Sequence, residues 1–159
     1  MKDMKNKMLL LSLFMSIVFL GINSAAQAQQ TKEAASFHGA KAVKSEYRAV
    51  FELNSGDDKD IRGTLRNMSN ILRDPRLKGK IQLELVAHSG GIVTFMKKND
   101  YSSLLKKLVE QGVILSACEN TMRERDIDKS EILPFVSFVP SGVGELVIRQ
   151  QQGWAMVHP

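Results

Sequence analysis

Residues 113–125, VILSACENTMRER, carry the pattern that decides the fold. Val113–Ala117 is a short, nearly continuous apolar run, which is typical of a strand that is covered on both faces. The run leads directly into Cys118, and Glu119–Arg125 follows as a short predicted helix. A buried strand that passes straight into a helix is typical of parallel sheets, so this stretch indicates an α/β domain.

Strand and helix patterns alternate on both sides of this stretch. Four more strands are predicted, over Tyr47–Asn54, Lys80–Ala87, Phe135–Val139 and Trp154–Val157. The spacing of apolar residues predicts helices over 61–72, 101–111 and 143–150, with short apolar or helical turns near 92–96 and 128–133. Strands that alternate with helices pair in parallel through right-handed crossovers. The sequence therefore predicts a three-layer α/β/α sandwich with a mainly parallel five-stranded sheet, whose strand order it leaves open.

The N-terminal residues predict export. Residues 1–28 have the form of a signal peptide: a lysine-rich start, the uncharged apolar run Leu9–Ile22, and the small residues Ala26 and Ala28 before a cleavage point. Residues 29–46 are polar and small, and they predict a flexible linker. Residues 47–159 then form one domain, and we expect the mature protein to be exported to the periplasm.

Composition narrows the classes of partner. The net charge of +5 comes from 22 Lys and Arg against 17 Asp and Glu, and the leader supplies three of those lysines and one of the acids. The remaining charges are mixed in sign, whereas a nucleic-acid-binding protein usually carries a basic stripe. No second apolar stretch approaches the roughly 20 residues that span a bilayer. We therefore expect neither a nucleic-acid partner nor a membrane-bound mature protein.

Cys118 is the single cysteine, so no internal disulfide can form. Two interpretations stay open: a buried, inert thiol, or a thiol that is there to react. Backbone N–H groups at a helix start lower the pKa of a thiol, whereas the neighbouring carboxylate of Glu119 raises it. Arg123 or Arg125 would offset Glu119 only if the helix turned one of them back.

Small and polar residues follow four of the predicted strands, at the edge where parallel sheets bind ligands. Turns need such residues in any case, so a purely structural role is the alternative. His88 is a candidate base or polariser for Cys118, and no spacing resembles a metal site. The candidate pocket residues are Asn54, Ser89, Gly90, Asn120, Ser141 and Gly142.

Two segments of the chain resemble the DsrE/DsrF-like family. They are Ala117–Met122, which contains Cys118, and Val139–Leu146, which is followed by Gly153-Trp154 and a last apolar strand. The resemblance covers nearly the whole mature domain and implies a sulfur-handling α/β protein that forms trimers or hexamers. It also implies that Cys118 carries sulfur as a persulfide and passes it to a partner thiol, without a cofactor.

Two functions follow from these observations. The first is an exported sulfur carrier or thiol-redox protein that uses Cys118. The second is a non-catalytic, oligomeric module that binds a small ligand and keeps Cys118 as a structural residue.

Polar residues on two strands, among them Arg48, Glu52 and Glu84, give parts of the sheet a polar face, and with the resemblance they predict a homotrimer or homohexamer. The sequence does not distinguish an enzyme from a stoichiometric carrier.

Overall fold

The computed structural model describes residues 36–158 of the 159-residue chain. The predicted signal peptide, residues 1–28, lies outside the described residues, and so do residues 29–35 of the predicted linker and Pro159. One compact unit begins at Ala42, shortly before the predicted domain boundary at Tyr47. Within the described part of the chain, no helix has the length and apolar character needed to cross a membrane.

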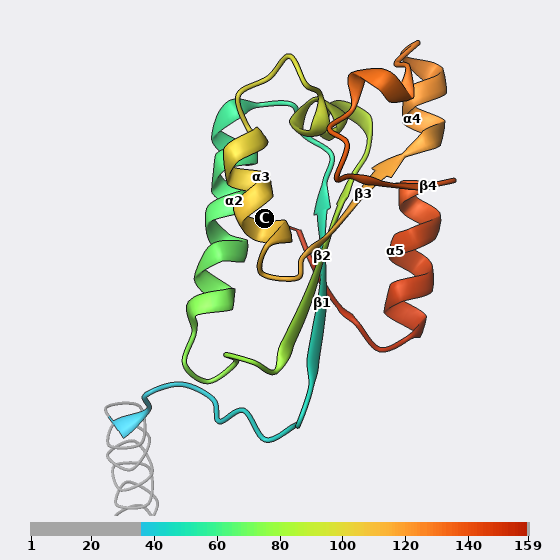
Figure 1. Ribbon diagram of the computed structural model, residues 1–159. Coiled ribbons are helices and arrows are strands. Elements are labelled where there is room, and N and C mark those ends of the chain that lie inside the picture. The colour runs from blue at the N-terminus through green and yellow to red at the C-terminus, as the bar shows by residue number, and fades with distance from the viewer. Residues whose placement is uncertain (1–35, 159) are drawn as a thin grey trace, which may run out of the picture. The chain divides into compact units, whose positions relative to one another are not determined.

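Five parallel strands form one sheet, which confirms the predicted fold class (Figure 1). Their order across the sheet is β4-β3-β2-β1-β5, so the fourth and fifth strands form the edges. Since all five strands run in the same direction, their carboxyl ends lie along one edge of the sheet. The strands are β1 (Tyr47–Leu53), β2 (Ile81–Ala87), β3 (Ile114–Cys118), β4 (Ser137–Val139) and β5 (Ala155–Val157).

Two helices, α2 (Asp58–Arg73) and α3 (Ser102–Val109), cover one face of the sheet (Figure 1). The α2 helix begins after Asp57, whose carboxylate accepts the backbone N–H groups of Lys59 and Asp60. Such a cap satisfies donors that the first turn of a helix leaves free. The helix stops at Asp74 because a proline follows it.

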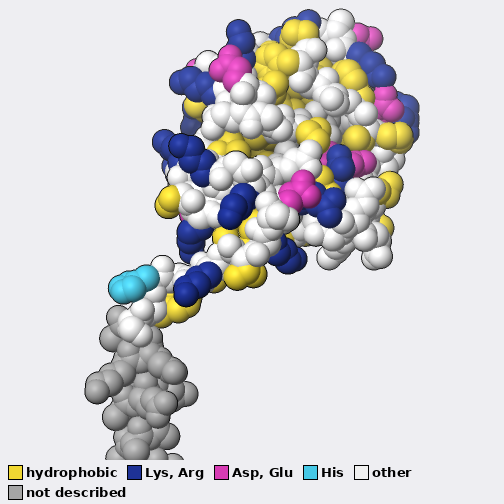
Figure 2. Space-filling model, turned by 60° about the horizontal axis from the view of Figure 1, so that its bottom comes forward, with side chains coloured by type: hydrophobic (Ala, Val, Ile, Leu, Met, Phe, Trp, Pro, Cys, Tyr) yellow, Lys and Arg dark blue, Asp and Glu magenta, His cyan; other side chains and the backbone are white. Residues whose placement is uncertain are grey.

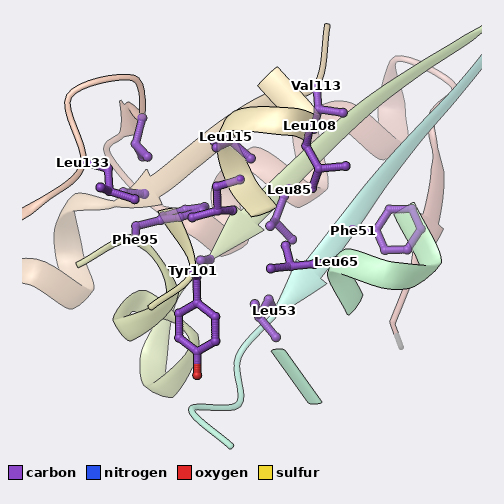
Figure 3. Packing of buried hydrophobic residues seen from close by; sticks show 14 of the residues in the cluster. Phe51, Leu53, Leu65, Leu85, Phe95, Tyr101, Leu108, Val113, Leu115 and Leu133 are labelled. Carbon is purple, nitrogen blue, oxygen red and sulfur yellow. The ribbon is translucent and has the colours of Figure 1, made fainter. Parts of the chain in front are cut away.

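The main core fills the space between these two helices and the sheet (Figure 3). Alternate residues of β1 and β2 point into it, among them Phe51 and Leu85, and Leu65 and Leu108 approach from the helices. All of these side chains are almost completely buried. The predicted alternation of apolar residues in the first two strands therefore marks the face that packs against α2 and α3.

The helix α5 (Gly142–Gln151) covers the opposite face. Its apolar core is small and consists of Val50, Val86, Leu146 and Trp154. The remaining elements connect the layers: the 3-10 helix η1 (Ser89–Phe95) follows β2, α4 (Glu119–Glu124) follows β3, and the 3-10 helix η2 (Lys129–Glu131) precedes β4. These agree with the short turns predicted near residues 92–96 and 128–133.

One expectation about this second face was wrong. Glu84 was predicted to contribute to a polar face of the sheet, but its side chain is only 1% exposed beneath α5. Its carboxylate forms an ion pair with Arg149 Nε at 2.6 Å and accepts a hydrogen bond from Ser116 Oγ at 2.6 Å. Arg149 also lies over the ring of Trp154. A charged group can be buried in this way when an opposite charge and a hydrogen-bond donor accompany it.

The surface carries charges of both signs. Figure 2 shows Lys and Arg side chains interspersed with Asp and Glu over the visible face of the domain. Several of these charges pair with near neighbours, as in the ion pairs of Arg62 with Asp58 and of Arg76 with Asp74. Exposed pairs of this kind contribute little to stability, so the buried layers are what determine the fold.

Candidate functional site

Four consecutive strands end at the same edge of the sheet, and the turns that follow them form the candidate site. Cys118 is the last residue of β3 and also the N-cap of α4. It neighbours the end of β2 on one side, and on the other side β4, whose last residue Val139 is its register partner. Cys118 is 4% exposed. The structure therefore places the single thiol near the middle of the edge where the sequence predicts a site.

The Cys118 sulfur accepts hydrogen bonds from two separate elements. The backbone N–H of Gly142, at the start of α5, donates to Sγ at 3.1 Å. The backbone N–H of Thr121, in the first turn of α4, donates to it at 3.5 Å. Two helix starts thus direct N–H groups at one sulfur atom, and such groups favour a negative charge on it.

These contacts determine the acidity of the thiol. Burial raises the pKa of Cys118, but hydrogen bonds from Thr121, Gly142 and Asn120 together outweigh this effect and leave the pKa below its ordinary value. A lowered pKa increases the fraction of thiolate, which is the nucleophilic form of cysteine. The contacts around Cys118 therefore favour its thiolate form.

Gly142 is needed for this close approach of helix and strand ends. A Cβ atom at this position would lie 3.0 Å from His88 Cβ and 3.2 Å from Cys118 Cβ, which is closer than such atoms normally come. The absence of a side chain therefore lets the start of α5 reach the ends of β2 and β3 together. It also shows that His88 and Cys118 lie on either side of the same glycine.

The charge next to Cys118 is balanced by a residue that the sequence did not indicate. Glu119 forms an ion pair with Lys129 Nζ at 2.5 Å. The predicted alternative, Arg123, instead donates a hydrogen bond to the side chain of Asn120. Lys129 is close to the helix in space but ten positions away in the sequence, so helical spacing could not point to it. It reduces the effect by which Glu119 opposes thiolate formation.

His88 contacts two other side chains rather than the thiol. Its Nε2 lies 2.9 Å from Glu52 Oε1, and its Nδ1 lies 3.1 Å from Ser89 Oγ. A second histidine, His158, approaches the other oxygen of Glu52 at 3.2 Å. With both ring nitrogens occupied, His88 is not arranged as a base for Cys118.

The other predicted pocket residues are only partly brought together. The Ser89 backbone N–H donates to Thr121 Oγ1 at 2.9 Å, which joins the turn after β2 to α4. A Cβ atom on Gly90 would lie 2.9 Å from the backbone oxygen of Asn54, so these two turns are in contact. The Ser141 hydroxyl accepts the Gly144 N–H and thereby caps α5, whereas the side chain of Asn120 is bound to an arginine.

Sequence reasoning missed two residues of this edge. Thr121 supplies a donor to the Cys118 sulfur, and Glu52 holds His88. Thr121 could have been found from its position, because it is the third residue after the predicted helix cap at Cys118. The backbone N–H at that position commonly donates to the side chain of the cap. No sequence signal pairs Glu52 with His88, because the two residues lie on different strands and their contact depends on which strands are neighbours in the sheet.

Two hollows adjoin this edge. A groove of about 580 Å³ lies along α4 and the segment after it, with Glu119, Met122 and Lys129 among its lining residues. A smaller cavity of about 100 Å³ lies at the end of β1, lined by residues that include Glu52, Asn54 and His158. Among residues 36–158, no group of three or more His, Cys, Asp and Glu side chains is arranged to hold a metal ion.

Comparison with known proteins agrees with this architecture. A model of the DsrE/DsrF-like family matches residues 15–159. The structure of MTH1491, a protein of unknown function from Methanobacterium thermoautotrophicum, is similar with a TM-score of 0.68 and 34% identity, covering 72% of this chain and 100% of that chain. The ychN protein from E. coli shares the fold alone, with a TM-score of 0.54, 15% identity, and coverage of 73% and 100%. No curated protein matches. The chain therefore belongs to the DsrE/DsrF-like family.

Proposed function

We propose that this protein is an exported sulfur carrier in which Cys118 accepts a sulfur atom as a persulfide and passes it to a partner thiol. The observation that carries the proposal is the pair of backbone N–H groups, from Thr121 and Gly142, that donate to the Cys118 sulfur. They come from different helices and stabilise the thiolate that such chemistry requires.

The transfer steps require only thiol chemistry. The Cys118 thiolate attacks the outer sulfur of a donor persulfide, R–S–SH, so that a new S–S bond forms, the donor S–S bond breaks, and R–S⁻ leaves to take up a proton. In the second step, a partner thiolate attacks the outer sulfur of the Cys118 persulfide, and Cys118 leaves as the thiolate. A thiol of lower pKa is the better leaving group, so the same two N–H donors favour loading and release.

Access to the sulfur restricts the donor and the acceptor. Cys118 is 4% exposed, between the ends of the neighbouring strands and the start of α5. A bulky folded surface cannot contact a sulfur atom at this depth. The proposal therefore favours a small sulfane-sulfur donor, or a partner cysteine that is presented on an extended segment.

Export and assembly are further parts of the proposal. The support for export to the periplasm is the leader pattern of residues 1–28. The support for a homotrimer or homohexamer is a set of exposed apolar side chains on α5 and β5, formed by Val143, Val147, Ile148 and Met156. Exposed apolar patches commonly mark contacts between protein chains. Light scattering on the mature protein tests assembly, and a monomer at working concentration contradicts it.

A second candidate function is a binding module in which Cys118 is structural. The burial of Cys118 and the small polar cavity at the end of β1 favour this alternative. The rate of alkylation of Cys118 by iodoacetamide in the native protein separates the two functions. Rapid reaction supports the carrier, whereas protection until denaturation supports the binding module.

The decisive experiment is intact mass spectrometry of the protein after incubation with a low-molecular-weight persulfide. The carrier gains one sulfur atom, about 32 Da by the chemistry of one added atom, and peptide mapping places it on Cys118. Cys118→Ser should fold normally and gain none, and Ser103→Ala, at an exposed position on α3, should load like the wild type. If the wild type never gains sulfur and Cys118→Ser is clearly destabilised, the structural role of the cysteine is the correct one.

A further inference from the structure

A chain of hydrogen bonds at the end of β2 is independent of the thiol. Ser89 Oγ lies 3.1 Å from His88 Nδ1, and His88 Nε2 lies 2.9 Å from Glu52 Oε1. The side chains of His88 and Glu52 are 11% and 15% exposed, whereas Ser89 is exposed. A hydroxyl, an imidazole and a carboxylate are therefore connected in series, with the hydroxyl at the exposed end.

The Glu52 carboxylate determines which ring nitrogen of neutral His88 carries the proton. Glu52 can only accept a hydrogen bond when it is ionised, so the ring proton must sit on Nε2. The other nitrogen, Nδ1, is then an acceptor that faces the Ser89 hydroxyl. The order of nucleophile, base and orienting carboxylate is the one found in serine hydrolases, but the two ring nitrogens are exchanged, since in those enzymes Nε2 faces the serine and Nδ1 faces the carboxylate.

The backbone around Ser89 has the form of a nucleophile turn. Ser89 has a φ of 47°, and it is one of two non-glycine residues with positive φ among residues 36–158. It lies where a parallel strand passes into a helical turn, within the sequence Ala87-His88-Ser89-Gly90-Gly91. In the strand–turn–helix that presents a catalytic serine, small residues two positions before and after the serine permit the same sharp turn.

The two glycines show how tightly this turn is held. A Cβ atom on Gly91 would lie 2.0 Å from the backbone oxygen of Leu53, and one on Gly90 would lie 2.8 Å from the backbone nitrogen of Gly56. Neither position can therefore carry a side chain without a shift of the backbone. A positive φ on a serine is unfavourable, and it persists only where the surroundings impose it.

A donor for a developing negative charge is also present. Within the described turn, the Ser89 N–H donates to Thr121 Oγ1 and the Gly91 N–H donates to the His88 carbonyl. The N–H of Gly90, the residue after the serine, is the donor that we assign to this charge. In serine hydrolases of the strand–turn–helix type, the same backbone N–H contributes to the oxyanion hole.

We propose that Ser89, His88 and Glu52 form an acyl-transfer site that accepts carboxylic esters. Ser89 Oγ attacks the carbonyl carbon, its proton passes to His88 Nδ1, and Glu52 stabilises the resulting imidazolium. The ester C–O bond then breaks, the leaving alcohol takes the proton from Nδ1, and the acyl group stays on Ser89. Water, activated by Nδ1, releases the carboxylic acid and restores the serine.

The probe is diisopropyl fluorophosphate, which phosphorylates an activated serine with loss of fluoride. We expect one adduct per wild-type chain, located on Ser89 by peptide mapping, and no adduct on Ser89→Ala. Ser103→Ala, at an exposed serine outside the turn, should be labelled at the wild-type rate. The phosphoryl group on Ser89 and a sulfur atom on Cys118 are separate mass changes, so this proposal and the carrier function succeed or fail independently.

Glu52→Gln tests the role of the carboxylate as a positioning residue. The amide of glutamine can donate to Nε2, so the proton of His88 moves to Nδ1 and the ring no longer accepts the serine proton. Labelling should fall at least a hundredfold, while the ¹⁵N shifts of the imidazole report the change of tautomer. Absence of an adduct on the wild-type protein, or an adduct on another residue, overturns the proposal. So does wild-type labelling of Glu52→Gln once its tautomer has switched.

Discussion

The two faces of the sheet are built on different principles. On the face beneath α2 and α3, large apolar side chains such as Phe51 and Leu85 form one extended core. On the face beneath α5, the apolar core is small, and the same strands place Glu84 and Cys118 there instead. One face thus supplies stability through apolar burial, whereas the other holds a charged group and the thiol of Cys118 through specific partners. Successive residues of a strand point to opposite faces, so one set of strands serves both purposes.

The largest effect should come from the extended core. Leu85→Ala should lower the free energy of unfolding by about 4 kcal/mol, because it leaves a cavity among side chains that cannot collapse around it. The matched change on the other face, Leu146→Ala, should cost about 2 kcal/mol, since its apolar cluster is smaller and lies under a helix with exposed side chains. Urea unfolding measures both values. Equal losses would show that the two faces contribute alike.

The next effect concerns the buried charge beneath α5. Arg149→Met should destabilise the protein by about 3 kcal/mol, because it leaves the Glu84 carboxylate buried without an opposite charge. The double variant Glu84→Gln/Arg149→Met should recover most of this loss, since glutamine carries no charge and can still accept from Ser116. Thermal unfolding of the single and double variants tests the prediction. A double variant as unstable as Arg149→Met alone would contradict it.

A smaller effect is expected where α5 meets the strand ends. Gly142→Ala should cost about 2 kcal/mol, because its Cβ would overlap with His88 and Cys118. It should also lengthen the bond from the Gly142 N–H to the sulfur and so raise the pKa of Cys118. The pH dependence of the alkylation rate measures that change.

The control for this substitution is Gly63→Ala in α2, where a Cβ atom would meet nothing within 4 Å. It should stabilise the protein by roughly 0.5–1 kcal/mol, as alanine does in an open helical position. Its alkylation profile should match that of the wild type. Destabilisation by both alanines would mean that helix geometry, and not the contact with His88 and Cys118, explains the effect at Gly142.

The smallest effect should come from a charge pair outside both faces. The side chain and backbone of Arg76 hydrogen-bond to Asp74 and lower its pKa from 3.8 to about 2. Because the pKa is depressed in the folded state, the pair stabilises the protein above about pH 4, and this contribution is lost as the pH falls toward 2. Asp74→Asn should therefore be slightly less stable than the wild type at pH 7 and equally stable below pH 2. A difference that persists at low pH would contradict this account.

The elements of the fold follow from local patterns, whereas their partners do not. Alternating residues such as Leu83 and Leu85 indicate a strand, and the small residues after four of the strands indicate the edge that forms the candidate site. The burial of Glu84 could not be predicted, because its partner Arg149 lies on a helix 65 positions further along the chain. The partner of His88 was missed for the same reason: Glu52 is adjacent only once the strand order places β1 beside β2. The periodicity of apolar residues predicts which side chains are buried, but which side chains contact one another depends on the order of the strands and helices in the fold.

The two N–H groups on the Cys118 sulfur also have a thermodynamic consequence. The folded protein holds the pKa of the Cys118 thiol below its ordinary value, which the unfolded chain retains. By linkage, loss of the thiol proton must then favour the folded state: the added stability is complete above the unfolded pKa and is lost as the pH falls through the folded one. The thiolate is therefore a pH-dependent connection between β3, α4 and the start of α5. A reagent that caps the sulfur removes that connection as well as the nucleophile.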